Sequence, residues 1–210
     1  MWRKKSPVGP PPRTNVGGEP LKVSVRSEPI VGYRMWRVKI GPAGLRLWAL
    51  NVYYEWQVEN TAACQPIKAN PWFPVPSTLL HEDPSPSVNC ACGLYAALPE
   101  APLQEWDHSI AGLVHASGTV ALTGRVIRCT LGYKAEHAEI QAPVVLEVNC
   151  IASTACPEPV VKVDVQKEYA RGWCADHAPK DVLDASQFMA EAVRQLSAHY
   201  QLAFLSWNLM

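Results

Sequence analysis

Residues 119–148 read TVALTGRVIRCTLGYKAEHAEIQAPVVLEV, and this stretch predicts a strand, a turn and a second strand. Gly124 marks an expected bulge or a close approach of the backbone, and Gly132 can supply the turn. Cys129 lies inside the first strand-like run, so we expect it in the core. The centre of the chain therefore favours a fold built on β-strands.

Further strand-like runs lie on both sides of this hairpin. They are KVSVR (22–26), RMWRVKI (34–40), LRLWALNVYYEWQV (45–58) and VVKVDV (160–165). In the second run Trp36, Val38 and Ile40 share one face. Arg37 and Lys39 share the other face, and this alternation is typical of a half-buried strand.

One convincing helix signal lies near the C-terminus. Met189, Val193, Leu196 and Tyr200 recur at the spacing of one helical face, and Asp184 or Ser186 can cap the helix start. At least five strand-like runs against this one helix predict a β-rich α+β fold with one long C-terminal helix.

Composition bounds the domain organisation. The 210 residues are 48% hydrophobic and carry no formal net charge, so no global field draws the chain to nucleic acid or to an anionic membrane. We expect a flexible basic Pro/Gly-rich arm over residues 1–20 and a β-rich core domain over 21–148. Residues 149–210 should hold a second Cys/His segment and the helix.

The N-terminal sequence MWRKKSPVGPPPRTNVGGEP has no apolar h-region, and no run of about 18 apolar residues occurs in the chain. The sequence therefore predicts a cytoplasmic protein with no membrane partner. Thiols stay reduced in that compartment, so the seven cysteines need another explanation than disulfides.

A first candidate metal set surrounds the sequence HEDPSPSVNCACGLYA (81–96). Cys90 and Cys92 lie two positions apart, so their side chains point to the same side of an extended chain, and Gly93 permits a tight turn after them. Cys64 and His81 complete a possible set of four zinc ligands. The alternative is that Cys64 is a small buried hydrophobic residue and His81 a surface residue.

A second candidate set lies downstream, where Cys150 and Cys156 precede VVKVDV and Cys174 and His177 follow it. This order resembles a small treble-clef or ribbon-like zinc knuckle. Unrelated buried thiols are the alternative. Together the two sets use six of the seven cysteines and predict two zinc ions per chain. The sequence favours the first set, because the C-x5-C spacing of the second departs from the usual tighter knuckle.

Three segments carry a resemblance to a known family. They are GYRMWRV (32–38), CACGLYA (90–96) and TGRVIRCTLGYKAEHAEI (123–140). The chain resembles an uncharacterised family of actinobacterial and actinophage proteins over residues 31–141. The resemblance implies an upstream cysteine and a histidine that join the C-x-C pair, and a possible phage origin, but no assigned activity.

The residues leave three classes of function open. Cys₃His sets are typical of closed structural sites, which favours a non-enzymatic zinc-stabilised binding or regulatory protein whose partner is a protein or nucleic acid. A zinc hydrolase or deaminase would use Glu82 or Glu136 as base, but the H-x-E and P-C-x-x-C signature of deaminases is absent. We predict no catalytic residue.

The third class is a nucleic-acid-binding protein that uses arginine and aromatic side chains of the strands. The alternative reading places Trp36 in the core and leaves the arginines as ordinary solvated or paired charges. The candidate ligand-binding residues are Arg34, Trp36, Arg37, Arg125, Tyr133 and Glu136.

Overall fold

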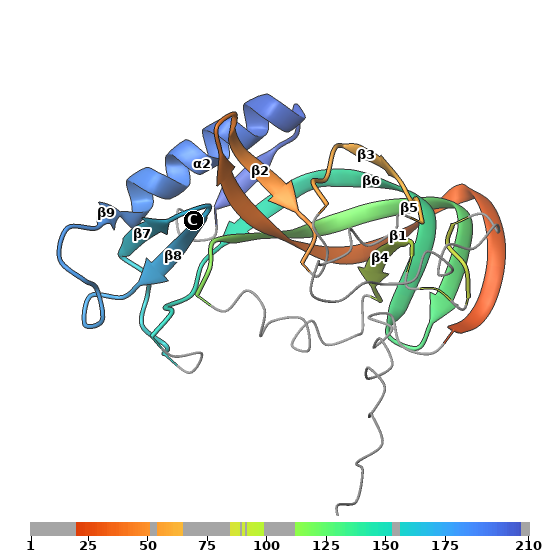
Figure 1. The fold of residues 1–210 in the computed structure, drawn as a ribbon, viewed down its shortest axis with the longest axis horizontal. Coiled ribbons are helices and arrows are strands. Elements are labelled where there is room, and N and C mark those ends of the chain that lie inside the picture. The colour runs from red at the N-terminus through yellow and green to blue at the C-terminus, as the bar shows by residue number, and fades with distance from the viewer. Residues whose placement is uncertain are drawn as a thin grey trace, which may run out of the picture.

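The computed structural model describes residues 20–50, 54–64, 85–88, 90, 92–98, 112–152 and 156–206, and the described chain is β-rich with a helix near the C-terminus (Figure 1). Its larger sheet has seven strands. They are β1 (Pro20–Gly41), β2 (Gly44–Trp48), β3 (Glu59–Thr61), β4 (Leu94–Ala97), β5 (His115–Cys129), β6 (Gly132–Glu147) and β10 (Phe204–Ser206). The predicted α+β, β-rich fold class is confirmed.

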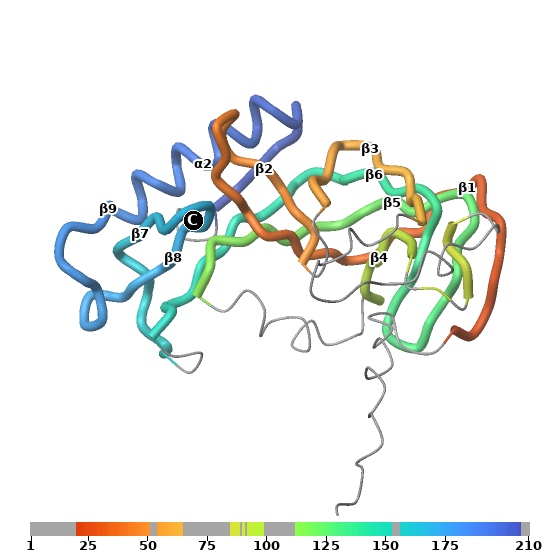
Figure 2. The backbone as a smooth tube through the Cα atoms, in the orientation of Figure 1, coloured from red at the N-terminus to blue at the C-terminus, as the bar shows by residue number. Residues whose placement is uncertain are grey.

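Four strands of this sheet pair in a ring. β5 pairs with β1 and β6, while β4 pairs with β6 and, at Tyr33–Ala97, with β1. β1, β5 and β6 are the long members and curve together across the molecule (Figure 2). At the closure a Cβ on Gly132 would lie 2.2 Å from the carbonyl oxygen of Ala96, so glycine is required for β4 and β6 to approach.

A smaller sheet and the helix follow β6. The sheet has the order β8 (Tyr169–Trp173), β7 (Lys162–Gln166), β9 (Leu183–Asp184). The helix α2 (Ala185–Tyr200) begins at the predicted cap, since Asp184 accepts hydrogen bonds from the backbone N–H groups of Ser186 and Gln187. β10 returns the chain to the larger sheet, where it runs parallel to β6.

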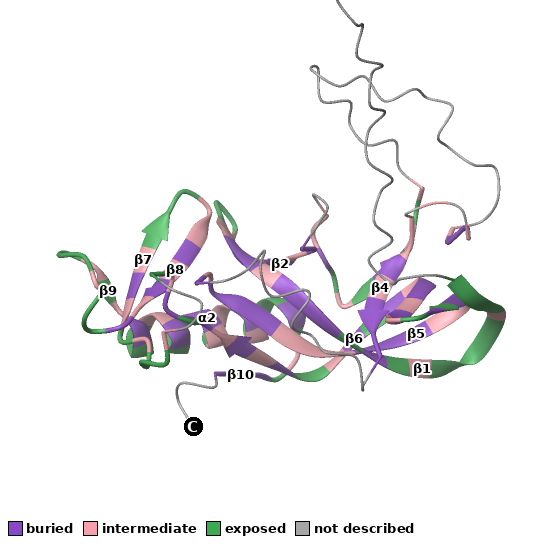
Figure 3. Ribbon diagram, turned by 90° about the horizontal axis from the view of Figure 1, so that it is seen from below, coloured by how far each residue is buried: buried purple, intermediate pink, exposed green. Residues whose placement is uncertain are grey.

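One hydrophobic core joins these parts. Its fully buried side chains include Trp36, Leu47, Trp56, Leu122, Ile140, Leu146, Met189 and Leu196. The Tyr200 hydroxyl links the helix to the sheet, because it donates to the Trp56 carbonyl and accepts from the Leu47 N–H. Figure 3 shows buried residues on both the sheet and the helix. The core crosses residue 148, so the expected boundary between the core domain and the C-terminal segment is not a break in packing.

The long hairpin is confirmed in detail. β5 and β6 match the predicted strand, turn and strand, and Cys129 is fully buried. Gly124 has φ +73° and lies within a register irregularity between Thr123 and Val126, as the predicted bulge requires.

Two predictions about the first strands are wrong. The separate strands at 22–26 and 34–40 are one strand, β1, which passes through a register shift between Arg26 and Ile30 without leaving β5. The half-buried alternation also fails, because the segment before β8 covers the polar face. There Lys39 is buried and pairs with Glu168 at 3.0 Å.

Elsewhere the predicted strand over 45–58 shortens to β2, followed by an isolated bridge between Trp48 and Glu55. The expected arm over residues 1–20 lies outside the described residues except for Pro20, the first residue of β1.

Candidate metal centres

Two clusters in the described chain could hold a metal ion. The first centre is Cys64, Cys90 and Cys92, and the second centre is Cys150, Cys156, Cys174 and His177. Within each cluster the candidate ligand atoms all lie within 4.8 Å of one another. The members of both sequence-predicted sets therefore lie close together, except for His81, which lies outside the described residues.

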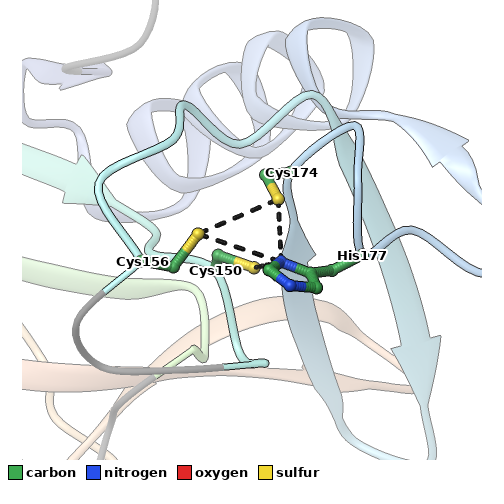
Figure 4. A group of neighbouring side chains, drawn as sticks. All are labelled: Cys150, Cys156, Cys174 and His177. Atoms are coloured by element: carbon green, nitrogen blue, oxygen red, sulfur yellow. Dashed lines mark hydrogen bonds between the residues drawn. The ribbon is translucent and has the colours of Figure 1, made fainter.

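Backbone contacts between the two sheets position the second centre. Cys150 follows β6 and forms an isolated parallel bridge with Gly172 of β8. Cys174 directly follows β8, and the His177 N–H donates to the Cys174 carbonyl at 3.3 Å across a tight turn. Figure 4 shows the four side chains pointing toward one another from these segments. The centre thus links the end of β6 to the β7–β8 hairpin.

Three of the four distances given below for the second centre are close to those of a tetrahedral zinc site, and the distance from Cys174 Sγ to His177 Nδ1 is shorter. Tetrahedral zinc with Zn–S bonds of about 2.3 Å separates two sulfurs by about 3.8 Å, and a sulfur from a nitrogen by about 3.6 Å. The Cys156 and Cys174 sulfurs are 3.9 Å apart. The His177 Nδ1 atom lies 3.6 Å from Cys150 Sγ, 3.9 Å from Cys156 Sγ and 3.0 Å from Cys174 Sγ. Four soft or borderline donors fit one zinc ion.

Electrostatics in the second centre favour a thiolate at Cys150. Burial opposes its ionisation, but hydrogen bonds from the backbone of Cys174 and Ala152 and from His177 outweigh burial and lower its pKa to about 7. At Cys156 the backbone of Glu158 favours the thiolate, whereas burial and the neighbouring sulfurs together raise the pKa. A divalent cation removes this conflict, because it stabilises several thiolates at once.

The first centre lies where β3 and β4 approach β6. Cys64 comes three residues after β3, and Cys90 and Cys92 precede β4. The Cys64 and Cys90 sulfurs are 3.8 Å apart, which is again a tetrahedral edge. The Ser87 N–H points at Cys92 Sγ at 3.4 Å. Three sulfurs therefore converge, and the chemistry of this donor set suits zinc.

Gly93 is required beside the first centre. Its φ is +123°, which side chains rarely adopt, and a Cβ would lie 2.4 Å from Lys134 Cγ. The sequence-based expectation of a tight turn after the C-x-C pair is confirmed at this residue.

Lys134 is the residue beside the first centre that sequence reasoning missed. Its side chain is fully buried, and its Nζ donates to the Ser87 carbonyl at 2.7 Å and to the Cys90 carbonyl at 2.8 Å. Burial lowers the pKa of Lys134, while the nearby Cys129, Cys92 and Cys90 thiols act in the opposite direction. A lysine in an alternating strand indicates a solvated face, so the sequence holds no signal of this role.

The cysteine sulfurs do not form disulfides in the described chain. A disulfide requires an S–S distance of about 2.05 Å, whereas the Cys64–Cys90 and Cys156–Cys174 pairs are 3.8 and 3.9 Å apart. Cys129 belongs to neither cluster and contacts the carbonyl of Ile127 at 3.9 Å.

Two of the predicted ligand-binding residues lie in the interior. Trp36 is fully buried against Trp56, with ring centroids 5.7 Å apart. The Arg34 guanidinium stacks 4.0 Å from the centroid of Trp56 and donates to the Tyr95 carbonyl, and burial lowers its pKa to about 9. Neither side chain is free to stack on a base.

The other predicted residues are half-buried. Arg37 and Tyr133 lie in β1 and β6. Glu136 accepts a hydrogen bond from the Arg125 backbone N–H at 2.9 Å and lies 3.4 Å from His137. The carboxylate of Glu136 is thus held by the Arg125 backbone in the bulge at Gly124. Glu82, the other candidate base, lies outside the described residues.

Comparisons with protein-family models, with curated proteins and with solved structures gave no match to this chain. Among the described residues, no helix is both long and apolar enough to cross a bilayer.

Proposed function

We propose that this chain is a non-enzymatic, zinc-stabilised binding or regulatory protein with two structural zinc ions. The observation that carries the proposal is the second centre, in which the ligand atoms of three cysteines and one histidine all lie within 4.8 Å of one another. A set of four protein ligands is typical of a structural zinc, because a catalytic zinc keeps a position for water or substrate.

The second zinc ion belongs to the first centre, with His81 proposed as its fourth ligand from the sequence. The three described sulfurs support this assignment. Free thiols at tetrahedral distances also support a reducing compartment such as the cytoplasm. The resemblance to actinobacterial and actinophage proteins stays part of the proposal and carries no activity with it.

A hydrolase or deaminase is less well supported than a binding protein. Glu136, the described candidate base, is engaged with the Arg125 backbone and points its carboxylate at the β5 bulge rather than at either cluster. Nucleic-acid binding through Arg34 and Trp36 is opposed by their burial.

Metal analysis of the purified full-length chain tests the proposal. We expect about two zinc ions per chain by elemental mass spectrometry, and we expect a strong chelator to lower the melting temperature sharply. A zinc content near zero would overturn the proposal. Nucleotide hydrolysis or deamination that disappears in Glu82→Gln or Glu136→Gln would overturn its non-enzymatic part.

A further inference from the structure

Lys134 is a buried cation without a carboxylate partner in the described chain. It lies in β6 between Tyr95 of β4 and Ile127 of β5, and its side chain has no exposed surface. The hydrogen-bond partners of its Nζ are two neutral carbonyls, those of Ser87 and Cys90. These carbonyls and the Tyr95 ring, whose centroid lies 6.0 Å from Nζ, compensate a buried charge only in part, so a negative charge nearby would stabilise this position.

The first centre supplies that negative charge when it holds zinc. A divalent ion bound by three thiolates and one neutral ligand carries a net charge of about −1. Lys134 donates to the backbone carbonyl of Cys90, so its charge is held against the loop that carries the ligand.

The same lysine also shapes the ligand loop. Its two hydrogen bonds fix the carbonyls of Ser87 and Cys90, and the Ser87 N–H then points at Cys92 Sγ. Its aliphatic stem occupies the space that a Cβ on Gly93 would need. The C-x-C-G turn and Lys134 therefore fit each other sterically as well as electrostatically.

We propose that Lys134 is the positioning residue and the buried counter-charge of the first metal centre. The inference rests on the proposed zinc occupancy of that centre. In this proposal, a residue that is not a metal ligand neutralises the charge of the zinc–thiolate complex. Metal affinity at this centre then depends on the charge of residue 134, and not only on its shape.

The test measures zinc retention at each centre separately in full-length protein. Zinc-loaded protein is exposed to graded chelator and then to N-ethylmaleimide, and peptide mass spectrometry reports which cysteines are protected. We expect Lys134→Met to expose Cys64, Cys90 and Cys92 at about 10- to 100-fold lower chelator concentration, the usual effect of losing a group that hydrogen-bonds to the residues around a metal. Cys150, Cys156 and Cys174 should stay protected as in the wild type.

Lys39→Met is the matched control. Lys39 is also buried, but its charge is paired with Glu168, which belongs to neither centre. This variant should leave the chelator dependence of the first centre unchanged. Equal loss of zinc from the first centre in both variants would overturn the proposal, because it would show a general effect of removing a buried lysine.

Charge compensation separates the electrostatic role from a steric one. Cys64→His replaces one thiolate by a neutral ligand, so the zinc complex becomes neutral without Lys134. We expect Lys134→Met to weaken zinc binding much less in the Cys64→His background than in the wild type. If Lys134→Met alone does not fold, the double variant should regain soluble, zinc-bound protein.

Failure of the role of Lys134 and failure of the zinc assignment give different results. An equal loss in both backgrounds, or a double variant that also fails to fold, would overturn the role of Lys134 alone. A wild type in which zinc never protects Cys64, Cys90 and Cys92 would overturn both the zinc assignment of the first centre and this inference.

Discussion

The two metal centres use similar ligands but lie in different surroundings. The second centre joins the end of β6 to the β7–β8 hairpin, and one of its ligands, His177, is exposed. The first centre lies beside β4 and β6, next to a fully buried lysine. The described ligands of the first centre are all half-buried, whereas Cys150 and Cys174 of the second centre are buried. The first centre therefore differs not by deeper burial of its ligands but by the buried cation beside it.

Sequence spacing favours the first centre, whereas the structure describes all four predicted ligands of the second centre alone, because His81 lies outside the described residues. The C-x-C-G turn makes the first centre the stronger prediction, and the wide C-x5-C spacing weakens the second. In the described chain the second centre is the complete quartet. The spacing of a ligand pair reports local chain geometry, but the parallel bridge between Cys150 and Gly172 brings distant segments together. That contact has no local signature.

The largest expected effect is the loss of a ligand from the second centre. Cys174 is buried and lies at the junction of the two sheets. Structural zinc returns roughly 10 kcal/mol or more as folding free energy in small peptides, which rivals the whole stability of a domain. We expect Cys174→Ser to give insoluble or molten protein, measured by expression yield and near-ultraviolet circular dichroism. A soluble variant with the wild-type melting temperature would show that the second centre is not structural.

The next largest effect is Cys92→Ser in the first centre. We expect zinc content to fall from about two to about one per chain and the free energy of unfolding to fall by several kcal/mol. The decrease should be smaller than for Cys174→Ser, because the described ligands of the first centre are half-buried, whereas Cys150 and Cys174 are buried. The measurements are elemental analysis and chemical denaturation. An unchanged zinc content would remove Cys92 from the ligand set.

Much of the fold is readable from local pattern. The β5–β6 hairpin, the strand around VVKVDV and the Asp184 cap of α2 each follow from residues close in sequence. The continuity of β1, the short strands β4, β8 and β9, and the burial of Lys39 do not. These depend on pairing between segments far apart in the chain, where tertiary contacts outweigh local preference.

The candidate sites divide in the same way. Seven of the eight predicted metal ligands are described, and they gather into the two predicted sets. Ligand chemistry is visible in the sequence because cysteine is rare and its spacing is informative. Lys134 is not visible, because a strand pattern cannot show that loop carbonyls cover a charged side chain. The burial of Arg34 against Trp56 is likewise not visible in the strand pattern, whereas the alternative reading that places Trp36 in the core is confirmed.

A smaller effect is expected where the first centre meets Lys134. Gly93→Ala forces a side chain into a backbone with φ +123° and against the Lys134 stem. We expect a loss of about 2–3 kcal/mol in unfolding free energy, from backbone strain and the steric conflict. Urea denaturation measures this loss. Gly41→Ala is the matched control, since the nearest atom to its added Cβ is 3.8 Å away, and it should be nearly neutral. Equal effects in the two variants would contradict the tight fit between Gly93 and Lys134.

The smallest expected effect is at Cys129, the one thiol that belongs to neither centre. It is fully buried, and burial raises its pKa, so at neutral pH it is an uncharged core thiol. Cys129→Ala removes only one buried sulfur, which should cost about 1 kcal/mol. Thermal unfolding should show this small decrease while the zinc content stays at about two per chain. Cys129 lies close enough to Lys134 to influence the pKa of the lysine, so this variant also tests whether Cys129 takes part in the first centre. If Cys129→Ala loses one zinc ion, Cys129 and not His81 completes the first centre.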